Sequence, residues 1–459
     1  MTENEAIFKA KSTIKSADLE HRKKINSFVG KYNSAVPSAK QQFTDNNFVK
    51  ERAKNIKWRA LETLDQHLEE FEMQFNRRGG KVIWAQNSQE ALDMILAICK
   101  EKDCKTVVKS TSMVTEEIQL DHFLEENGIE SVETGLGAYI QQMDGEAPYH
   151  IVNPSIHKSK EEVAKLFEDK LGTPSKLSPQ ELTLVAREKL REKYVQARVG
   201  ITGANFIISD IGGIAITENE GNGRLCSAWP DTHIVVTGIE KMIPSMNDLA
   251  LFWPLLATYG SGQKVTTYNS IICGPRQPGE TDGPKEMYVI LLDNNRSNVL
   301  ASPRQRESLY CIKCGACLNV CPVYKNVGGH SYGTTYTGPI GSVITPNMNG
   351  LDEYKHLSFA SSLCGACTEV CPMKINIHEL LLVNRSESVE QGMNSFSEKM
   401  AWKVWKTASL KRSLMNMGNG KLRSRVLNTL FKDWNNHHSP LEFSKKTFNQ
   451  MWKERQMLK

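Results

Sequence analysis

The sequence contains no long apolar run and no recognisable secretion signal. Its longest uncharged apolar stretch, LALFWPLLATYGSG from Leu249, is too short to span a bilayer and is interrupted by Pro254. The N-terminal residues MTENEAIFKAKSTIKS include early acidic side chains and no apolar core. We therefore expect a cytoplasmic protein with no transmembrane segment.

Common nucleotide-binding motifs are also missing. The sequence has neither G-x-G-x-x-G after a predicted strand nor G-x4-G-K-[ST], and GLGAYI at Gly135 is only a glycine pair. We therefore predict no nicotinamide or ATP site. Nucleic-acid recognition motifs are absent as well, so nucleic acid is not an expected partner.

The net charge is small, but it is unevenly distributed. It is only +5 overall, yet residues 386–459 contain 14 Lys and Arg against 6 Asp and Glu, so this tail is strongly basic and the remainder slightly acidic. The tail also has helical apolar spacing and carries Trp402 and Trp405. A solvated helical surface explains it most simply, and docking of a protein partner is the next interpretation.

The 11 cysteines are the most informative residues present. In a reducing cytoplasm they indicate metal binding rather than disulfides. CIKCGACLNVCP, Cys311 to Pro322, has the pattern C-x2-C-x2-C-x3-C-P, and SSLCGACTEVCP repeats it with Ser361 in place of the first cysteine. Paired C-x2-C motifs can hold structural zinc, but this density, the repeat and the Cys-Pro ending favour iron–sulfur clusters.

An iron–sulfur cubane needs soft thiolates that converge on one point. Small residues such as Gly315 and Gly365 let backbone N–H groups approach the cluster sulfurs. In two-cluster ferredoxins the fourth cysteine of a motif binds the other cluster. The spacing therefore predicts two ligand sets: Cys311, Cys314, Cys317 and Cys371 for cluster 1, and Cys321, Cys364 and Cys367 for cluster 2.

Cluster 2 is one cysteine short. Three outcomes are open: a [3Fe–4S] cluster, a [4Fe–4S] cluster with water, Ser361 or another non-cysteine ligand, or completion by a distant cysteine. We favour a [4Fe–4S] cluster that is open at one iron. Cys99 lies in an apolar helical pattern and is predicted to be core, whereas Cys104, Cys226 and Cys273 are scattered.

Periodicity and composition divide the chain into four regions. Residues 1–75 have helical apolar spacing. Residues 76–296 alternate strand-like and helical patterns, which predicts an open, mostly parallel α/β sheet. Residues 297–385 hold the cysteine motifs, with a predicted loop, GGHSYGTTYTGPIGSVITPNMNG, between them. Residues 386–459 form the basic helical tail.

Polar residues of the α/β region are candidates for a binding site. Gly212 and Gly213 suit a tight turn or close approach of a ligand. The next strand, GGIAITE, ends in a group of polar residues that would face the crevice of an open sheet. Their preference for turns is an alternative explanation. The residues are Thr217, Glu218, Asn219, Glu220 and Asn222.

A second group of candidates follows the strand TVVKS. Lys109, Ser110 and Ser112 precede a predicted helix and could hold a carboxylate or a phosphate. Three histidines complete the candidates: His233 begins a strand and is predicted to be structural, whereas His157 and His330 lie in predicted loops and could act as bases or hydrogen-bond donors.

The order of these features resembles the lactate utilization protein B family. The resemblance rests on GITGANFIISDIGGIAITENEGN, CIKCGACLNVCPVY, GPIGSVITP, SLCGACTEVCP and the basic tail, and it covers nearly the whole chain. Ser361 is no departure, since the family has the same seven-cysteine pattern. The resemblance implies two [4Fe–4S] clusters, a helical ferredoxin-type domain at 297–385, and a lactate-utilization (LUD) domain at 76–296 with a sugar-isomerase and CoA-transferase-like fold.

The resemblance also implies a role. The family takes part in oxidising L-lactate to pyruvate, which allows growth on lactate, together with lactate utilization proteins A and C. This chain would be an electron-carrying subunit of that oxidoreductase system rather than a complete enzyme, and its α/β domain could bind the organic acid. An alternative is a CoA-transferase-like enzyme with structural clusters, in which Glu218 or Glu220 is the nucleophile. A redox-sensing regulator that binds DNA through the tail is a third hypothesis.

Overall fold

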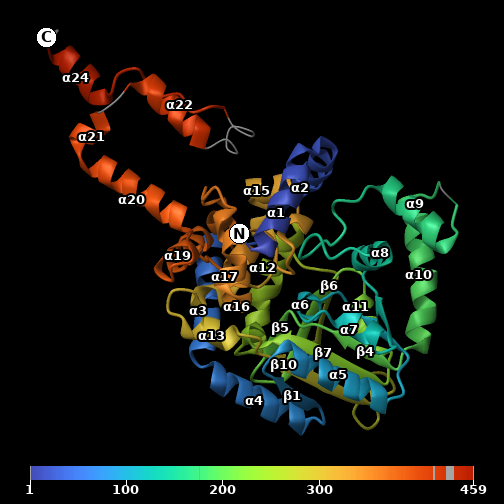
Figure 1. The fold of residues 1–459 in the computed structure, drawn as a ribbon. Coiled ribbons are helices and arrows are strands. Elements are labelled where there is room, and N and C mark those ends of the chain that lie inside the picture. Colours follow the sequence, from blue (N-terminus) through green and yellow to red (C-terminus); the bar gives the residue numbers. More distant parts are fainter. Residues whose placement is uncertain (1, 175, 417–418, 431–438, 458–459) are drawn as a thin grey trace. The chain divides into compact units, whose positions relative to one another are not determined.

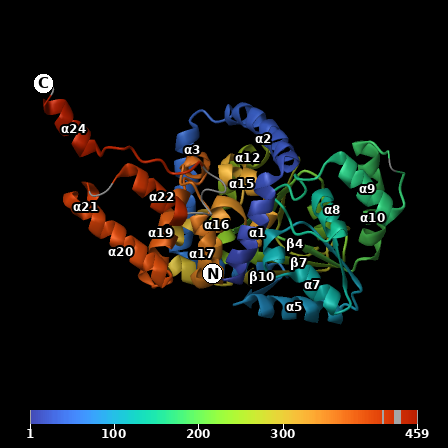
Figure 2. The ribbon, with the colours of Figure 1, turned by 45° about the horizontal axis from the view of Figure 1, so that its top comes forward.

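The computed structural model describes residues 2–174, 176–416, 419–430 and 439–457. The chain forms two compact units, Met1–Ser388 and Val389–Lys459. Figures 1 and 2 show the elements of both units from two directions.

The first unit begins with four helices. Short polar side chains cap the first three: among them, Asp18 accepts the N–H of His21 at 2.9 Å, and Asp45 accepts that of Phe48 at 2.9 Å. Helices α2 and α4 each bury a mainly apolar stripe, whereas α3 buries Lys50 and Lys57 beside its apolar residues. The helices are α1 (Glu3–Ala17), α2 (Leu19–Lys40), α3 (Asn46–Glu62) and α4 (Leu64–Arg77).

A six-stranded parallel sheet forms the centre of the α/β region, in the order β1-β10-β7-β4-β2-β3. The sequence prediction of an open, mostly parallel sheet is confirmed. The inner strands β4, β7 and β10 are buried on both faces and largely apolar, whereas the edge strand β1 is partly exposed and the edge strand β3 reads ESVE. The strands are β1 (Lys81–Ala85), β2 (Thr106–Lys109), β3 (Glu130–Glu133), β4 (Val199–Thr202), β7 (Thr232–Gly238) and β10 (Glu286–Leu292).

Helices cover both faces of this sheet (Figure 1). One face packs against α5 (Ser88–Glu101), α6 (Met113–Glu117) and α7 (Leu120–Glu126). The other face packs against α4, α10 (Pro179–Gln196) and α11 (Asn222–Ala228). Helix α12 (Leu249–Ser261) shares the apolar core of this side and packs against α2 and α3. The region is therefore a three-layer α/β structure.

A second, four-stranded sheet was not predicted. Its order is β8-β5-β6-β9, and β6 pairs antiparallel with both neighbours. Gly212 makes the tight turn between β5 and β6 at φ +55°, where a Cβ would lie 2.5 Å from the backbone nitrogen of Phe75. The glycine pair therefore serves chain packing. The strands are β5 (Phe206–Ile208), β6 (Gly213–Glu218), β8 (Met242–Ile243) and β9 (Tyr268–Ile272).

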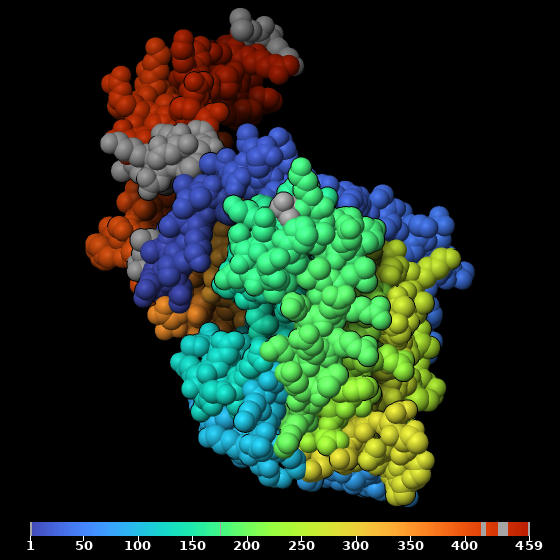
Figure 3. Space-filling view, turned by 90° about the vertical axis from the view of Figure 1, so that its right-hand side faces the viewer, coloured from blue at the N-terminus to red at the C-terminus, as the bar shows by residue number. Residues whose placement is uncertain are grey.

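Helices α8 (Leu136–Asp144), α9 (Lys160–Leu171) and α10 share a small apolar core of their own (Figure 2). Ser159 with Glu162 and Ser178 with Glu181 form capping boxes that start α9 and α10. Figure 3 shows the residues of α9 and α10 spread over one surface of this unit.

The cysteine region is helical, which confirms the predicted ferredoxin-type domain after the α/β domain. The prediction of a loop over 328–350 was wrong, because Gly338–Asn349 forms α16. The next helix, α17 (Leu351–Phe359), lies outside that predicted loop. Pro339 occupies the first turn of α16, where no N–H is needed, and the apolar side chains of the helix are buried. Short helices flank the motifs: α13 (Arg296–Ala301), η3 (Arg306–Tyr310), α14 (Ala316–Val320), α15 (Pro322–Val327), η4 (His330–Tyr332), α18 (Ala366–Val370) and α19 (Ile377–Glu390).

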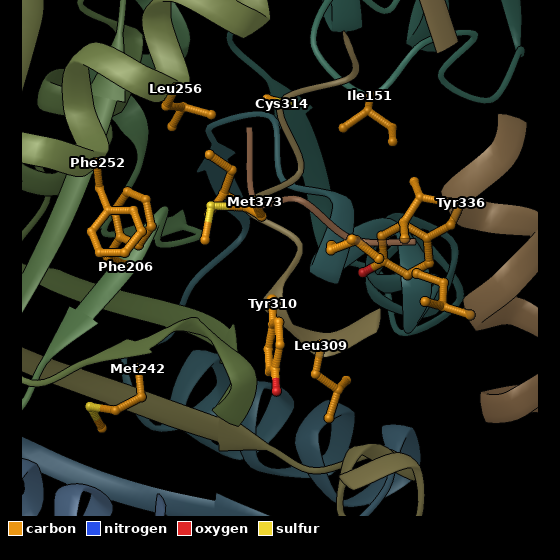
Figure 4. Close-up of a cluster of buried hydrophobic side chains, with 14 of the residues drawn as sticks. Ile151, Phe206, Met242, Phe252, Leu256, Leu309, Tyr310, Cys314, Tyr336 and Met373 are labelled. Atoms are coloured by element: carbon orange, nitrogen blue, oxygen red, sulfur yellow. The ribbon is translucent and has the colours of Figure 1, made fainter. Parts of the chain in front are cut away.

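The cysteine region shares one apolar core with the α/β region. Figure 4 shows Phe206 and Phe252 from the α/β side beside Cys314 and Met373 from the cysteine motifs. Burial of this common core joins the two regions into one unit.

The described part of the second unit contains α20 (Phe396–Leu410), α21 (Arg412–Asn416), α22 (Gly420–Leu430) and α24 (Phe448–Met457). Neither α20 nor α24 buries a side chain. Across the described part of the chain, every helix is too short or too polar to cross a bilayer.

Candidate metal centre

Four thiols surround one small apolar cavity, and we call them the first thiol group: Cys311, Cys314, Cys317 and Cys371. Cys311 and Cys314 lie in the loop that leads into α14, and Cys317 lies in the first turn of that helix. Cys371 follows α18, more than fifty positions later in the chain. Gly315 lies in the left-handed region at φ +75° and turns that loop. Ile340, Ile375 and Ile377 form the apolar wall. These four thiols are the set that the crossed spacing assigns to one cluster.

The thiols of this group interact electrostatically. Burial raises the pKa of Cys314, and the neighbouring Cys311 and Cys371 raise it further. Burial likewise raises the pKa of Cys371 to about 12, although the N–H groups of Ile375 and Met373 point toward its sulfur. Soft donors, backbone N–H groups aimed at sulfur and an apolar wall are what an iron–sulfur cluster requires. The residues therefore fit such a group.

The second thiol group is smaller: Cys321, Cys364 and Cys367. Burial raises the pKa of Cys367 to about 11, and the charges of Cys321 and Cys364 add to this effect. The Tyr324 N–H donates to the Cys321 sulfur at 3.4 Å, which also starts α15. Cys364 is exposed, whereas Cys367 is buried. The second group thus lies at the surface, while three of the four thiols in the first group are buried.

The other four cysteines have different neighbours. Cys99 and Cys104 lie together in the core beside α5, which agrees with the core prediction for Cys99. Cys226 contacts the Thr134 hydroxyl at 3.3 Å, and burial raises the pKa of Cys273, which lies beside Arg78. Each is therefore engaged away from the second thiol group, and completion of that group by a distant cysteine is not supported.

Ser361 occupies the position where a fourth cysteine is missing. Its hydroxyl oxygen accepts the Leu363 N–H at 3.1 Å, and its carbonyl oxygen accepts from Arg385 at 3.1 Å. The adjacent Ser362 interacts with the Cys364 thiol, whose pKa is lowered by the Ala366 N–H and by this serine. The Ser362 hydroxyl therefore lies next to one thiol of the second group, that of Cys364.

A buried ion network lies between the α/β region and the cysteine region, and the sequence did not predict it. Arg296 is 1% exposed and donates to Glu240 at 2.5 Å and to Glu117 at 2.7 Å. Tyr336, from the segment between the motifs, also donates to Glu117 at 2.7 Å. Burial raises the pKa of Glu240, but Arg296 and Lys241 outweigh it and lower the pKa to about 2. These elements are tens of residues apart, so no local signal marks their meeting.

The anion site predicted at Lys109 is not present. Lys109 is fully buried, and its ammonium lies 3.0 Å from Glu116, 2.9 Å from Asp121 and 2.6 Å from Glu133. Three carboxylates already surround it, which leaves no place for an anion. The carboxylates come from α6, α7 and β3, and the sequence gives no sign that these elements meet.

The polar segment after β6 is structural in this geometry. Glu218 accepts the N–H groups of Gly223 and Arg224, each at 2.8 Å, and so caps α11. Glu220 accepts the Leu136 N–H at 2.8 Å, and burial raises its pKa. Because β6 belongs to the mixed sheet, this segment does not follow a strand of the parallel sheet, contrary to expectation.

The three candidate histidines differ in their surroundings. His233 is fully buried and bonds the Thr202 hydroxyl at 2.8 Å, in agreement with a structural role. His157 and His330, predicted in separate loops, are brought together with Glu146.

Comparisons with known proteins agree with this architecture. Residues 68–292 match the LUD domain, and residues 307–375 match the 4Fe-4S dicluster domain. The chain is 46% identical over 368 residues to lactate utilization protein B of Bacillus licheniformis, covering 80% of this chain and 77% of that protein. The B. velezensis protein of the same name gives the same identity and coverage, and that of B. thuringiensis is 45% identical over 370 residues.

One solved structure was also found, a DUF162 family protein from Deinococcus radiodurans. It is 13% identical, with a TM-score of 0.28, and the alignment covers 50% of this chain and 98% of that one. At that TM-score the likeness supports no further argument.

Proposed function

Because this chain belongs to the lactate utilization protein B family, we propose that it carries electrons during the oxidation of L-lactate to pyruvate. The observation that supports this most is the separation of seven cysteines into two thiol groups within one unit. Oxidation of lactate to pyruvate releases two electrons, and two one-electron centres match that number. In this proposal the chain is one subunit of a lactate-oxidising system, and that system allows the organism to use lactate as a carbon source.

The first thiol group would hold a [4Fe–4S] cluster through all four sulfurs. The second would hold another through Cys321, Cys364 and Cys367, with water or Ser361 at the remaining iron. A bound cluster supplies reversible one-electron chemistry at a potential set by its surroundings. The apolar wall of Ile340, Ile375 and Ile377 excludes water from the first site. The exposure of Cys364 makes the second site accessible to a partner.

We propose lactate utilization proteins A and C as the partners. The sequence has no nicotinamide or ATP motif, so the first oxidation of the organic acid would use a partner or the α/β domain of this chain. Two-electron chemistry at the substrate would thereby be separated from one-electron transfer at the cysteines.

Anaerobic reconstitution tests this function. The protein should bind about eight iron atoms per chain, and L-lactate should bleach its visible absorbance only when the partner proteins are present. Omission of each partner in turn is the control. A colourless protein that binds zinc in place of iron would overturn the proposal. A CoA-exchange activity that Glu220→Gln destroys, but cluster loss does not, would favour the CoA-transferase-like alternative.

The second thiol group makes a separate prediction. Electron paramagnetic resonance of protein kept strictly anaerobic should show no oxidised [3Fe–4S] signal, and brief air exposure should produce one as the open iron is lost. Ser361→Cys supplies a fourth thiol and should suppress the air-induced signal. An oxidised [3Fe–4S] signal before any exposure to air would show that the open-iron assignment is wrong.

A further inference from the structure

Three side chains with metal-binding atoms meet outside the thiol groups: Glu146, His157 and His330. Glu146 follows α8, His157 precedes α9, and His330 begins η4 in the cysteine region. One ligand atom from each lies within 4.8 Å of the other two. The His157 Nε2 is 2.9 Å from a Glu146 carboxylate oxygen. Two imidazoles and one carboxylate form a common ligand set for divalent transition metals.

Both imidazole rings are held in place. Tyr149 stacks on His157 with centroids 4.5 Å apart and meets His330 edge-on at 5.0 Å. The His330 Nε2 lies 2.7 Å from the Ala147 carbonyl oxygen, so Nε2 carries the proton and Nδ1 keeps a free lone pair. A ring nitrogen that donates to a carbonyl while the other binds metal is the usual arrangement of a ligating histidine.

The hydrogen bonds within this cluster leave one buried atom unexplained. The His157 Nδ1 has no hydrogen-bond partner among the described residues. Burial also lowers the pKa of His157 to about 4, which keeps the ring neutral, as a metal ligand must be. An ion shared with Glu146 would bind the His157 Nε2, which faces that carboxylate, and the ring proton would then be on Nδ1.

Neighbouring charges both oppose and favour a cation. The Lys158 ammonium lies 2.9 Å from Glu146 and also contacts Asp144, and Lys11 and His21 are further basic groups near the histidines. Lys158 thus contacts the same Glu146 oxygen, Oε2, that faces the His157 Nε2, so an ion would bind the other carboxylate oxygen or displace Lys158. The acidic triad around Lys109 differs, because all three of its carboxylates bind that ammonium.

The cluster borders a large cavity. Glu146 and His330 line a cavity of about 980 Å³, which also reaches Glu133 at the end of β3 and Asn294 just after β10. This is the carboxyl edge of the parallel sheet, where ligands of open α/β folds bind. Gln141 lines the same cavity, is 1% exposed, and has no hydrogen-bond partner for its side-chain amide among the described residues.

We propose that Glu146, His157 and His330 bind one zinc ion, with a coordination position open to this cavity. Three protein ligands and one open position are typical of zinc sites that bind a further small molecule. An oxygen donor, such as water or an organic carboxylate, would take that position. The ion would also link the α/β region to the cysteine region. This inference goes beyond the proposed electron transfer and does not depend on it.

Zinc binding to the cluster-loaded protein tests the inference. Equilibrium dialysis against buffered Zn²⁺ should give one tightly bound zinc per chain, with the iron content unchanged. His157→Ala and His330→Ala should each weaken binding at least about tenfold. His122→Ala is the matched control, because His122 lines the same cavity, is 70% exposed and should leave the affinity unchanged. Equal affinity in all of these proteins would overturn the proposal.

X-ray absorption at the zinc edge separates this site from the cysteines. The first shell should contain only nitrogen and oxygen at about 2.0–2.1 Å, and a sulfur shell near 2.3 Å would show thiol binding and overturn the proposal. Since iron and cluster absorbance are measured on the same samples, loss of zinc binding is distinguishable from loss of the clusters. Circular dichroism of each variant confirms that it is folded.

Discussion

Replacement of Cys314 by alanine will abolish growth on lactate as sole carbon source and remove about half of the iron and visible absorbance. Cys314 is 7% exposed and faces the cavity shared by the first thiol group. Loss of one thiolate leaves that cavity with three donors and an unfilled space in an apolar wall. The second thiol group takes no ligand from Cys314 and should keep its iron.

The matched control is Cys273→Ser. Cys273 is half-buried beside Arg78 and belongs to neither thiol group, so this variant should keep full iron content and growth. Iron is measured on anaerobically purified protein, and growth is measured in a strain whose own copy is replaced by the variant. Growth of the Cys314→Ala strain at the normal rate would contradict the electron-transfer role. Loss of all iron would instead show that the two sites fold together.

Replacement of Arg296 by methionine will lower the free energy of unfolding by about 3–5 kcal/mol, the usual effect of removing one partner of a buried ion pair. Methionine fills much of the arginine volume but leaves Glu117 and Glu240 buried without the guanidinium that joins them, and only Glu240 keeps a cation, Lys241, close by. Both carboxylates are almost inaccessible, with 6% and 4% of their side chains exposed. Lys57 compensates little, because its ammonium bonds the backbone oxygen of Glu240 rather than its carboxylate.

Urea unfolding, followed by tryptophan fluorescence under anaerobic conditions, measures this effect. The control is Lys285→Met, which removes a pair with Asp231 in which both side chains are about 60% exposed, and it should change stability by less than about 1 kcal/mol. Adding Glu240→Gln to Arg296→Met should recover part of the loss, since one uncompensated charge is then removed. An Arg296→Met protein as stable as the Lys285→Met protein would show that the network contributes little.

Patterns within short segments of the sequence predicted the cysteine ligand sets and several strands. Spacing of the cysteines led to the two predicted ligand sets, because the loop around Gly315 needs only neighbouring residues to bring three thiols together. Apolar runs such as TVVKS and THIVVTG predicted strands correctly, because burial on both faces of a parallel sheet demands such runs. Helix α16 was not predicted because its glycines and prolines are typical of loops, although its apolar side chains are buried in the core.

Contacts between distant residues came only from the folded chain. Lys109 was predicted to bind an anionic ligand, yet three carboxylates from separate elements surround its ammonium. The ion pair of Arg296 with Glu240 was not predicted from the sequence. The pairing of His157 with His330 depends on how the α/β region packs against the cysteine region. The periodicity of a short segment shows which of its side chains will be buried. Which helix or strand packs against that buried face depends on the packing of the whole core, and therefore on residues far away in the chain.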